Sequence, residues 1–122
     1  MVILWQEVMA TGERGWEWIQ RTDEYNKSGS NKDGRVIYSD LKILMLTDDV
    51  VRISRSKGTI VTQYWECFVP KFELTEDDIV PVINRTFFRK NGVTYKVVGI
   101  HDLTEDPEFF CYRLTLRRDS LY

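Results

Sequence analysis

Short alternations of apolar and polar residues, separated by turn residues, dominate the pattern of this chain. The clearest example surrounds Asn91-Gly92, which separates two runs rich in aromatic and β-branched residues. Asn-Gly in this setting predicts a β-hairpin with a type I′ turn, because both central residues of that turn need positive φ. The two-residue turn also predicts the register, which pairs Lys90 with Val93, Arg89 with Thr94, and Phe88 with Tyr95.

This register gives the hairpin two faces, of which we expect one to be buried and one to meet solvent. The buried face consists of Phe88, Tyr95 and Val97, and the opposite face of Arg89, Thr94 and Lys96. Similar alternation predicts further strands at residues 16–21, 35–46, 49–54, 59–69 and 108–118. The apolar start at residues 2–8 is predicted to be a strand as well.

Helical patterns are nearly absent from the sequence. No stretch of ten or more residues repeats its apolar positions with a period of 3.6 residues. Thr75, followed by three acidic residues, predicts an N-cap and a single helical turn before Pro81. The short strands and frequent turns predict a mostly-β fold: a small antiparallel β-barrel or sandwich with long exposed loops and at most one short helical turn.

The length of 122 residues fits a single domain, residues 1–122. Residues 23–34 are polar and rich in turn formers, which predicts a long exposed loop, and residues 119–122 are predicted to be a short tail. The pattern Leu-Thr-acidic occurs three times, at residues 46–49, 74–78 and 103–106. We expect three turns in which the threonine bonds to the backbone; a site for a hard cation such as calcium is the alternative.

Composition and charge narrow the class of protein. The chain is 43% hydrophobic and 30% charged, which is ordinary for a globular protein. Its 17 basic and 19 acidic residues give a net charge of −2, whereas a dedicated nucleic-acid-binding domain is normally strongly basic. The sequence has no recognisable signal peptide and no apolar run of the roughly 20 residues that a membrane helix needs. We therefore expect synthesis in a reducing cytoplasm and no membrane partner.

Candidate chemistry is sparse. His101, the only histidine, has no nucleophile or metal ligand at a recognisable spacing; a Cys–His pair with Cys67 or Cys111 is the alternative. Both cysteines lie among strand residues, so we expect reduced thiols that pack as small apolar groups, with a single disulfide as the other interpretation. No glycine-rich phosphate loop precedes a helix. The sequence thus predicts a protein that is not an enzyme, with no catalytic residue, metal site or cofactor.

A basic turn between two predicted strands is the most distinctive polar feature. It consists of Ser54, Arg55, Ser56, Lys57 and Gly58, and Arg52 lies close to it in the sequence. Such a turn can face a nucleic-acid backbone, although a solvated hairpin tip has the same composition. An OB-like β-barrel that binds nucleic acid is therefore the alternative function. Against it, Trp65 shares its predicted face with aliphatic residues, which is typical of a core.

The order of several motifs resembles that of a known family. Residues 65–70 read Trp-Glu-Cys-Phe-Val-Pro, an acidic turn follows at residues 75–78, and residues 90–100 read Lys-Asn-Gly-Val-Thr-Tyr-Lys-Val-Val-Gly-Ile. This order, over residues 54–100, resembles the small β-barrel head-closure or head–tail connector proteins of long-tailed bacteriophages. The amino-terminal third matches no motif of that family, so adaptor, stopper and tail terminator are open alternatives.

The resemblance implies a structural virion protein of the phage neck. It implies a homo-oligomeric ring that joins the DNA-filled head to the tail, contacts the portal-side connector and tail proteins, and surrounds the channel that the packaged DNA traverses. In that family an exposed loop between two strands can project into the channel and hold back the DNA, and the matching position here is the basic turn at residues 54–58. The implied location is the head–tail joint of the virion, after synthesis in the host cytoplasm.

Two segments are candidates for contacts between subunits. The apolar amino terminus has the composition of a strand that pairs with the edge of an adjacent subunit. The polar loop at residues 23–34 is predicted to become ordered against a neighbour. An intrachain strand and a floppy loop are the corresponding alternatives. The residues concerned are Val2, Ile3, Leu4 and Trp5 in the first segment, and Tyr25, Asn26 and Lys27 in the second.

Overall fold

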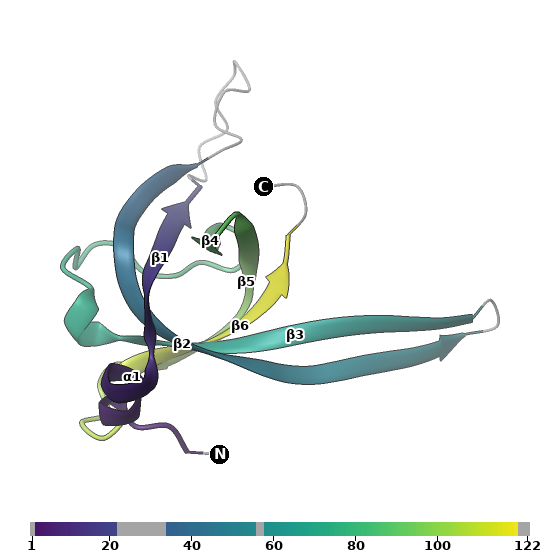
Figure 1. The fold of residues 1–122 in the computed structure, drawn as a ribbon, viewed down its shortest axis with the longest axis horizontal. Coiled ribbons are helices and arrows are strands. Elements are labelled where there is room, and N and C mark those ends of the chain that lie inside the picture. Colours follow the sequence, from purple (N-terminus) through teal and green to yellow (C-terminus); the bar gives the residue numbers. More distant parts are fainter. Residues whose placement is uncertain (1, 22–33, 56–57, 120–122) are drawn as a thin grey trace.

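Six antiparallel strands close into a barrel in the computed structural model of the chain (Figure 1). The structure describes residues 2–21, 34–55 and 58–119, with only the backbone described at residues 47–55 and 58–62. The elements are α1 (Trp5–Thr11), β1 (Glu13–Gln20), β2 (Arg35–Arg55), β3 (Gly58–Pro70), the short 3-10 helix η2 (Lys71–Glu73), β4 (Thr86–Lys90), β5 (Val93–Leu103) and β6 (Cys111–Arg118). The order around the barrel is β1-β2-β3-β6-β5-β4, and β4 pairs with β1 to close it. The predicted mostly-β class and antiparallel barrel are confirmed.

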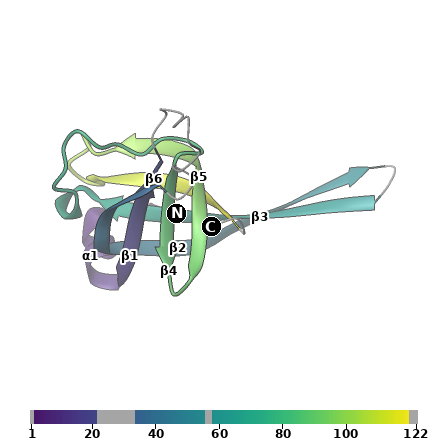
Figure 2. The same cartoon turned by 90° about the horizontal axis from the view of Figure 1, so that it is seen from above.

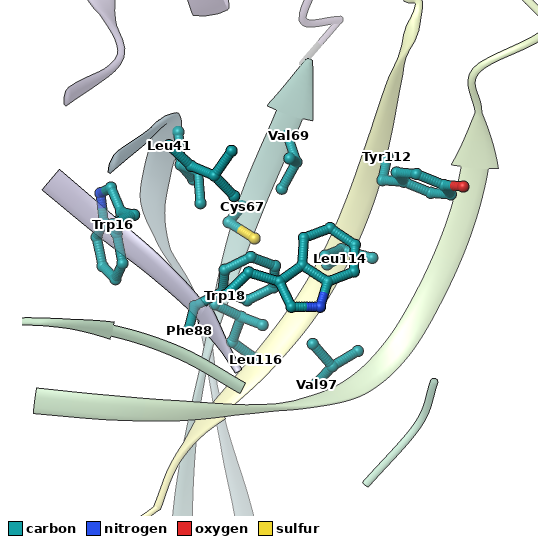
Figure 3. Packing of buried hydrophobic residues seen from close by; sticks show 11 residues of the cluster. Trp16, Trp18, Leu41, Cys67, Val69, Phe88, Val97, Tyr112, Leu114 and Leu116 are labelled. Carbon is teal, nitrogen blue, oxygen red and sulfur yellow. The ribbon is translucent and has the colours of Figure 1, made fainter. Parts of the chain in front are cut away.

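Aromatic and aliphatic side chains fill the inside of the barrel (Figure 3). Trp18 is fully buried, and its ring lies edge-on to Phe88 and Tyr38, with centroids 5.3 and 5.5 Å away. Edge-to-face contacts of this kind are favourable, and each large side chain removed from water contributes about 1.5–3 kcal/mol. The buried members of this cluster are Trp16, Trp18, Leu41, Ile43, Cys67, Val69, Phe88, Val97, Tyr112, Leu114 and Leu116.

The hairpin between β4 and β5 has the predicted register, which pairs Lys90 with Val93, Arg89 with Thr94, and Phe88 with Tyr95. Asn91 and Gly92 have φ values of 53° and 79°, as a type I′ turn requires. The expectation that Thr94 meets solvent was wrong, since this residue is only 2% exposed. The backbone N–H of Asp119 donates to the Thr94 carbonyl oxygen at 2.9 Å, so the chain that leaves β6 runs beside this position.

β2 is one long strand rather than the two strands predicted at residues 35–46 and 49–54. Thr47 pairs with Trp65 and Val50 with Gln63, and the register shifts between these two pairs. A β-bulge accommodates extra residues without ending a strand, and this one accommodates the two aspartates between Thr47 and Val50. The turn predicted at residues 46–49 was therefore wrong.

The amino-terminal segment forms a helix instead of the predicted strand. Most residues of α1 have good helix propensity, and Trp5, Val8 and Met9 follow the i, i+3, i+4 spacing of a helix face. Ile3 and Val8 are buried in a second cluster on the outside of the barrel, together with Phe68 and Cys111. A helix of seven residues is marginal by itself, so packing against the barrel decides its structure.

The connection from β3 to β4 lies against the barrel core. Leu74 and Ile79 pack on the core cluster, and the helical turn predicted at Thr75 is absent; the nearest helix is η2, which ends at Glu73. One backbone hydrogen bond of 3.1 Å, from Ile79 to the carbonyl of Glu76, closes a single turn. Leu74 and Ile79 thus attach the connection to the core in a non-helical conformation.

Side-chain hydrogen bonds attach this connection to the barrel. Gln20 Oε1 accepts hydrogen bonds from Trp18 Nε1 at 2.8 Å and from the Thr86 hydroxyl at 2.6 Å. Gln20 Nε2 donates to the carbonyl of Val80 at 3.1 Å, and the Thr86 hydroxyl accepts from the backbone N–H of Val82 at 2.8 Å. Buried polar groups need such partners, and these bonds link β1, β4 and the connection.

Candidate functional site

The β2–β3 hairpin extends well beyond the barrel as a twisted two-stranded arm, defined here as residues 47–55 and 58–64 (Figures 1 and 2). β1 pairs with β2 only as far as Ile43, and β6 pairs with β3 only from Trp65 onward. Beyond these points, the two described strands pair only with each other. At about 3.4 Å per residue, residues 47–55 extend over roughly 30 Å.

The predicted channel loop lies at the far end of this arm. Ser54 pairs with Thr59 and Arg55 with Gly58, so the predicted turn is the connection between β2 and β3 (Figure 2). Ser56 and Lys57 lie outside the described residues. The structure thus puts the end of β2 and the start of β3 at a distance from the barrel (Figure 2), whereas the sequence alone indicated only that the basic turn lies between two strands.

Three aromatic residues attach the base of the arm to the barrel. The ring of Trp65 lies 5.2 Å from that of Tyr95, which in turn lies 6.0 Å from Trp16. All three pack in the core cluster, so the interpretation of Trp65 as a core residue is confirmed. The ammonium of Lys90 lies 5.8 Å from the Trp16 ring, within the range of a cation–π contact.

The amino-terminal candidates for subunit contacts divide between core and surface. Ile3 is 4% exposed and packs on its own barrel, whereas Val2 is 65% exposed. Leu4 and Trp5 are partly buried. The intrachain alternative therefore holds for Ile3, although this residue lies just before α1 and not in a strand. The three candidates in the polar loop, Tyr25, Asn26 and Lys27, lie outside the described residues, as does the predicted loop up to Asp33.

An aromatic surface patch beside α1 was missed by sequence reasoning. Phe72 is 54% exposed, and its ring contacts Trp5 at 5.0 Å and Phe110 at 4.7 Å between centroids. The Lys71 ammonium lies 5.4 Å from the Phe110 ring. These four residues come from three separate segments. The only local sequence signal was at Phe72, which follows the Val-Pro end of β3 and was therefore expected to lie outside the strand. Exposed aromatic groups of this kind are typical of contact surfaces.

Several basic side chains of the barrel are paired with carboxylates. Arg89 donates two hydrogen bonds to Glu17, of 2.9 and 3.3 Å, and these bonds are the main cause that lowers the pKa of Glu17. The other pairs are Lys90 with Glu13, Arg14 with Glu73, and Arg113 with Glu66. By contrast, Arg117 and Arg118 at the end of β6 are exposed, and Arg117 pairs in register with Lys96. Lys96 and Arg117 therefore place two basic residues side by side at this end of the barrel.

The two cysteines are free and buried, as predicted. Burial raises the pKa of Cys67 and raises that of Cys111 to about 11. Both thiols are therefore protonated near neutral pH, which disfavours nucleophilic chemistry. His101 is exposed on β5 and lies opposite Arg113 in the ladder. This arrangement brings none of the sequence-predicted chemical groups together as a catalytic pair.

The acidic turn after β5 is stabilised by aspartate rather than by the threonine we expected. Asp102 Oδ1 accepts hydrogen bonds from the Thr104 backbone N–H at 2.9 Å and the Thr104 hydroxyl at 2.6 Å. Asp106 Oδ1 likewise accepts from the backbone N–H of Glu108 at 2.8 Å. Within the described part of the chain, no three His, Cys, Asp or Glu side chains are grouped so as to hold a metal ion.

No protein-family model matches the chain, and no curated protein is significantly similar to it. Among the described residues, no helix has the length and apolar character needed to cross a membrane.

Proposed function

We propose that this protein is a structural connector of a phage neck, forming a homo-oligomeric ring that joins the DNA-filled head to the tail. In this proposal the arms point into the channel, and their basic ends help to close it around the DNA. The observation that carries the proposal is the arm itself, which holds the end of β2 and the start of β3 away from a closed barrel (Figure 2). The resemblance implies a projecting loop at this position in the order of strands.

Charge supports an encounter between the arm and DNA. The sequence carries Arg52 and Arg55 near the end of β2, and Lys57 lies between β2 and β3 in the sequence. Basic side chains near phosphates release counterions and bind without sequence preference. A contact of this kind suits DNA that slides past during packaging and ejection, because it does not read the bases.

Other surfaces suit contacts with neck partners. The patch formed by Trp5, Phe72 and Phe110 lies on the outside of the barrel beside α1, away from the arm. Aromatic residues are enriched at protein interfaces. We assign this patch to the portal-side connector or to a tail protein, and the arm to the channel.

Charge reversal in the virus that encodes the chain tests the proposal. Arg55→Glu with Lys57→Glu should yield joined particles that leak DNA, because acidic tips repel the phosphate backbone. The matched control, Arg117→Glu with Arg118→Glu, changes the same charge at the end of β6 and should retain the DNA. Electron microscopy and nuclease protection measure both outcomes. Heads that stay filled with reversed tips would contradict the channel role, and normal particles without the gene would contradict the neck role.

A β-barrel that binds nucleic acid in solution is the second candidate. Basic residues at the end of β6 favour it, because Arg117 and Arg118 are exposed and Arg117 pairs with Lys96 of β5 across the ladder. Fluorescence anisotropy with single-stranded DNA distinguishes the candidates. A monomer whose affinity falls steeply with salt, and is lost when Arg117 and Arg118 are reversed, would favour the second candidate.

A further inference from the structure

The arm has two open edges. β2 has no strand partner beyond Ile43 on the side where β1 pairs, and β3 has none before Trp65 on the side where β6 pairs, among the residues that the structure describes. The barrel closes on itself, because β4 pairs with β1, and a closed barrel leaves no edge. The unpaired backbone N–H and C=O groups of the described strands therefore gather on the arm.

A two-stranded ribbon is a poor structure in isolation. Two strands without a third strand or a covering element are marginally stable in water, and exposed edges are templates for pairing with another chain. The two edges differ in composition: β3 carries no charged residue and no proline between Gly58 and Tyr64, whereas β2 carries Asp48, Asp49, Arg52 and Arg55. Charged residues and proline are the usual residues that block an edge, so the β3 edge is the less protected of the two. The arm is thus built to receive further strands.

We infer that arms of neighbouring copies pair edge to edge, with β2 of one copy antiparallel to β3 of the next. For an antiparallel contact, strand direction requires this combination when the arms point the same way, because β2 leaves the barrel and β3 returns to it (Figure 1). A pairing of β2 with β2 would be antiparallel only between arms that point in opposite directions. The contact uses different edges on the two copies, which is the heterologous type; it generates a ring when the rotation between copies closes and an open filament when it does not.

Charge along the two strands favours the same combination. β2 carries Asp48, Asp49, Arg52 and Arg55 over the arm, while residues 58–64 of β3 are neutral. Like charges directly opposite each other destabilise a ladder. Pairing β2 with β3 always sets a charged strand beside a neutral one. Successive arms therefore join without placing like charges directly across from each other. The inference takes one premise from the proposed function, namely that the arms of neighbouring copies in the ring point in the same direction.

Cysteine cross-linking tests the edge combination directly. Two single variants, Val51→Cys on β2 and Thr62→Cys on β3, are treated with a short bis-maleimide at the highest soluble concentration, with and without duplex DNA. The native cysteines are buried and protonated, so the introduced thiol reacts selectively. Only the mixture of variants should give covalent dimers. Gln6→Cys, on the exposed side of α1, is the control and should not cross-link.

Each outcome bears on the inference. Dimers from Val51→Cys alone would show β2–β2 pairing, and the absence of dimers in the mixture would show that the arms do not meet; either result overturns it. Amide hydrogen exchange gives a second measurement on the unmodified chain: assembly should slow exchange at residues 48–54 and 58–64 several-fold and leave β4 unchanged. The pairing and the proposed function can fail separately. If the arms cross-link as expected, but heads and tails still join when the gene is absent, the proposed function is refuted and the inference of arm pairing stands.

Discussion

One amide side chain connects three parts of the barrel. Gln20 receives hydrogen bonds from Trp18 and Thr86 and donates one to the connection at Val80. Trp18 and Thr86 are both fully buried, so their polar atoms depend on this partner. In the sequence, Gln20 is only a polar residue at the end of a predicted strand. No local pattern marks a side chain that provides hydrogen-bond partners for buried groups elsewhere in the chain.

Replacing Gln20 with alanine should lower the free energy of unfolding by about 1–3 kcal/mol, because buried donors lose their partner. Urea denaturation followed by tryptophan fluorescence measures the change. Gln6→Ala, at an exposed position of α1, is the matched control and should change stability by less than about 0.5 kcal/mol. An equally small effect at Gln20 would mean that water replaces the amide.

The buried thiols predict a loss of stability at alkaline pH. Burial raises the pKa of Cys111 from its usual 9.0 to about 11. Below pH 9 the thiol is protonated in both the folded and the unfolded chain, so its contribution is fully present. Between pH 9 and 11 only the unfolded chain releases the proton, and the free energy of unfolding falls by up to about 1.4 kcal/mol per pH unit for this group.

Urea denaturation at pH 8, 9, 10 and 11 tests this dependence. In the Cys111→Ala variant, the free energy of unfolding should fall less steeply with pH, because the contribution of this thiol is absent. Cys67 and Tyr112, whose pKa values are also raised by burial, should account for the slope that remains. Parallel pH profiles for the variant and the parent protein would contradict the assignment.

At the scale of elements, hairpins were predicted well because their information is local. Asn91-Gly92 specifies its own turn, and alternation specifies which residues of β3 face inward, such as Cys67 and Val69. The helix α1 and the unbroken course of β2 depend on distant packing and on a bulge. The aromatic patch joins residues from three segments, and a single sequence gives no signal for such a contact.

The fold requires glycine at positions 12 and 92 for different reasons, and substitutions at the two positions distinguish these reasons. At Gly92 an added Cβ meets no atom within 4 Å, but φ is +79°. At Gly12, φ is an ordinary −67°, but the Cβ would lie 2.5 Å from the Val8 carbonyl oxygen and 3.2 Å from the backbone of Ile43. Gly92→Ala should therefore cost about 1 kcal/mol from strain alone, and Gly12→Ala about 1–3 kcal/mol from overpacking between α1 and β2.

Asparagine at both positions provides the control. It tolerates positive φ, so Gly92→Asn should recover most of the loss at the turn, whereas Gly12→Asn should be at least as unstable as the alanine variant. Thermal unfolding of the four variants measures the contrast. Recovery at position 12 would show that conformation, and not contact with Val8, requires the glycine.

At the scale of the whole molecule, barrel and arm are separable. Thr47 and Trp65 face each other at the base of the arm, so Asn-Gly in place of residues 48–64 joins them by a short turn. We expect the shortened chain to fold with a free energy of unfolding within about 1 kcal/mol of the parent, because the barrel core and the contacts among Trp16, Trp65 and Tyr95 stay intact. Light scattering should show no assembly. A barrel that unfolds would mean that the arm supports it.

The closing contact of the barrel joins residues far apart in the chain. Glu17 and Arg89, which face each other across β1 and β4, are 72 positions apart. Folding slows as contacting residues become more distant in sequence. On the ribosome, β1 is made early but waits for β4, while the β2–β3 hairpin forms from neighbouring residues. The arm edges are therefore available before the barrel is complete, so a low level of expression, which keeps few unfinished chains together, should favour native subunits over aggregates.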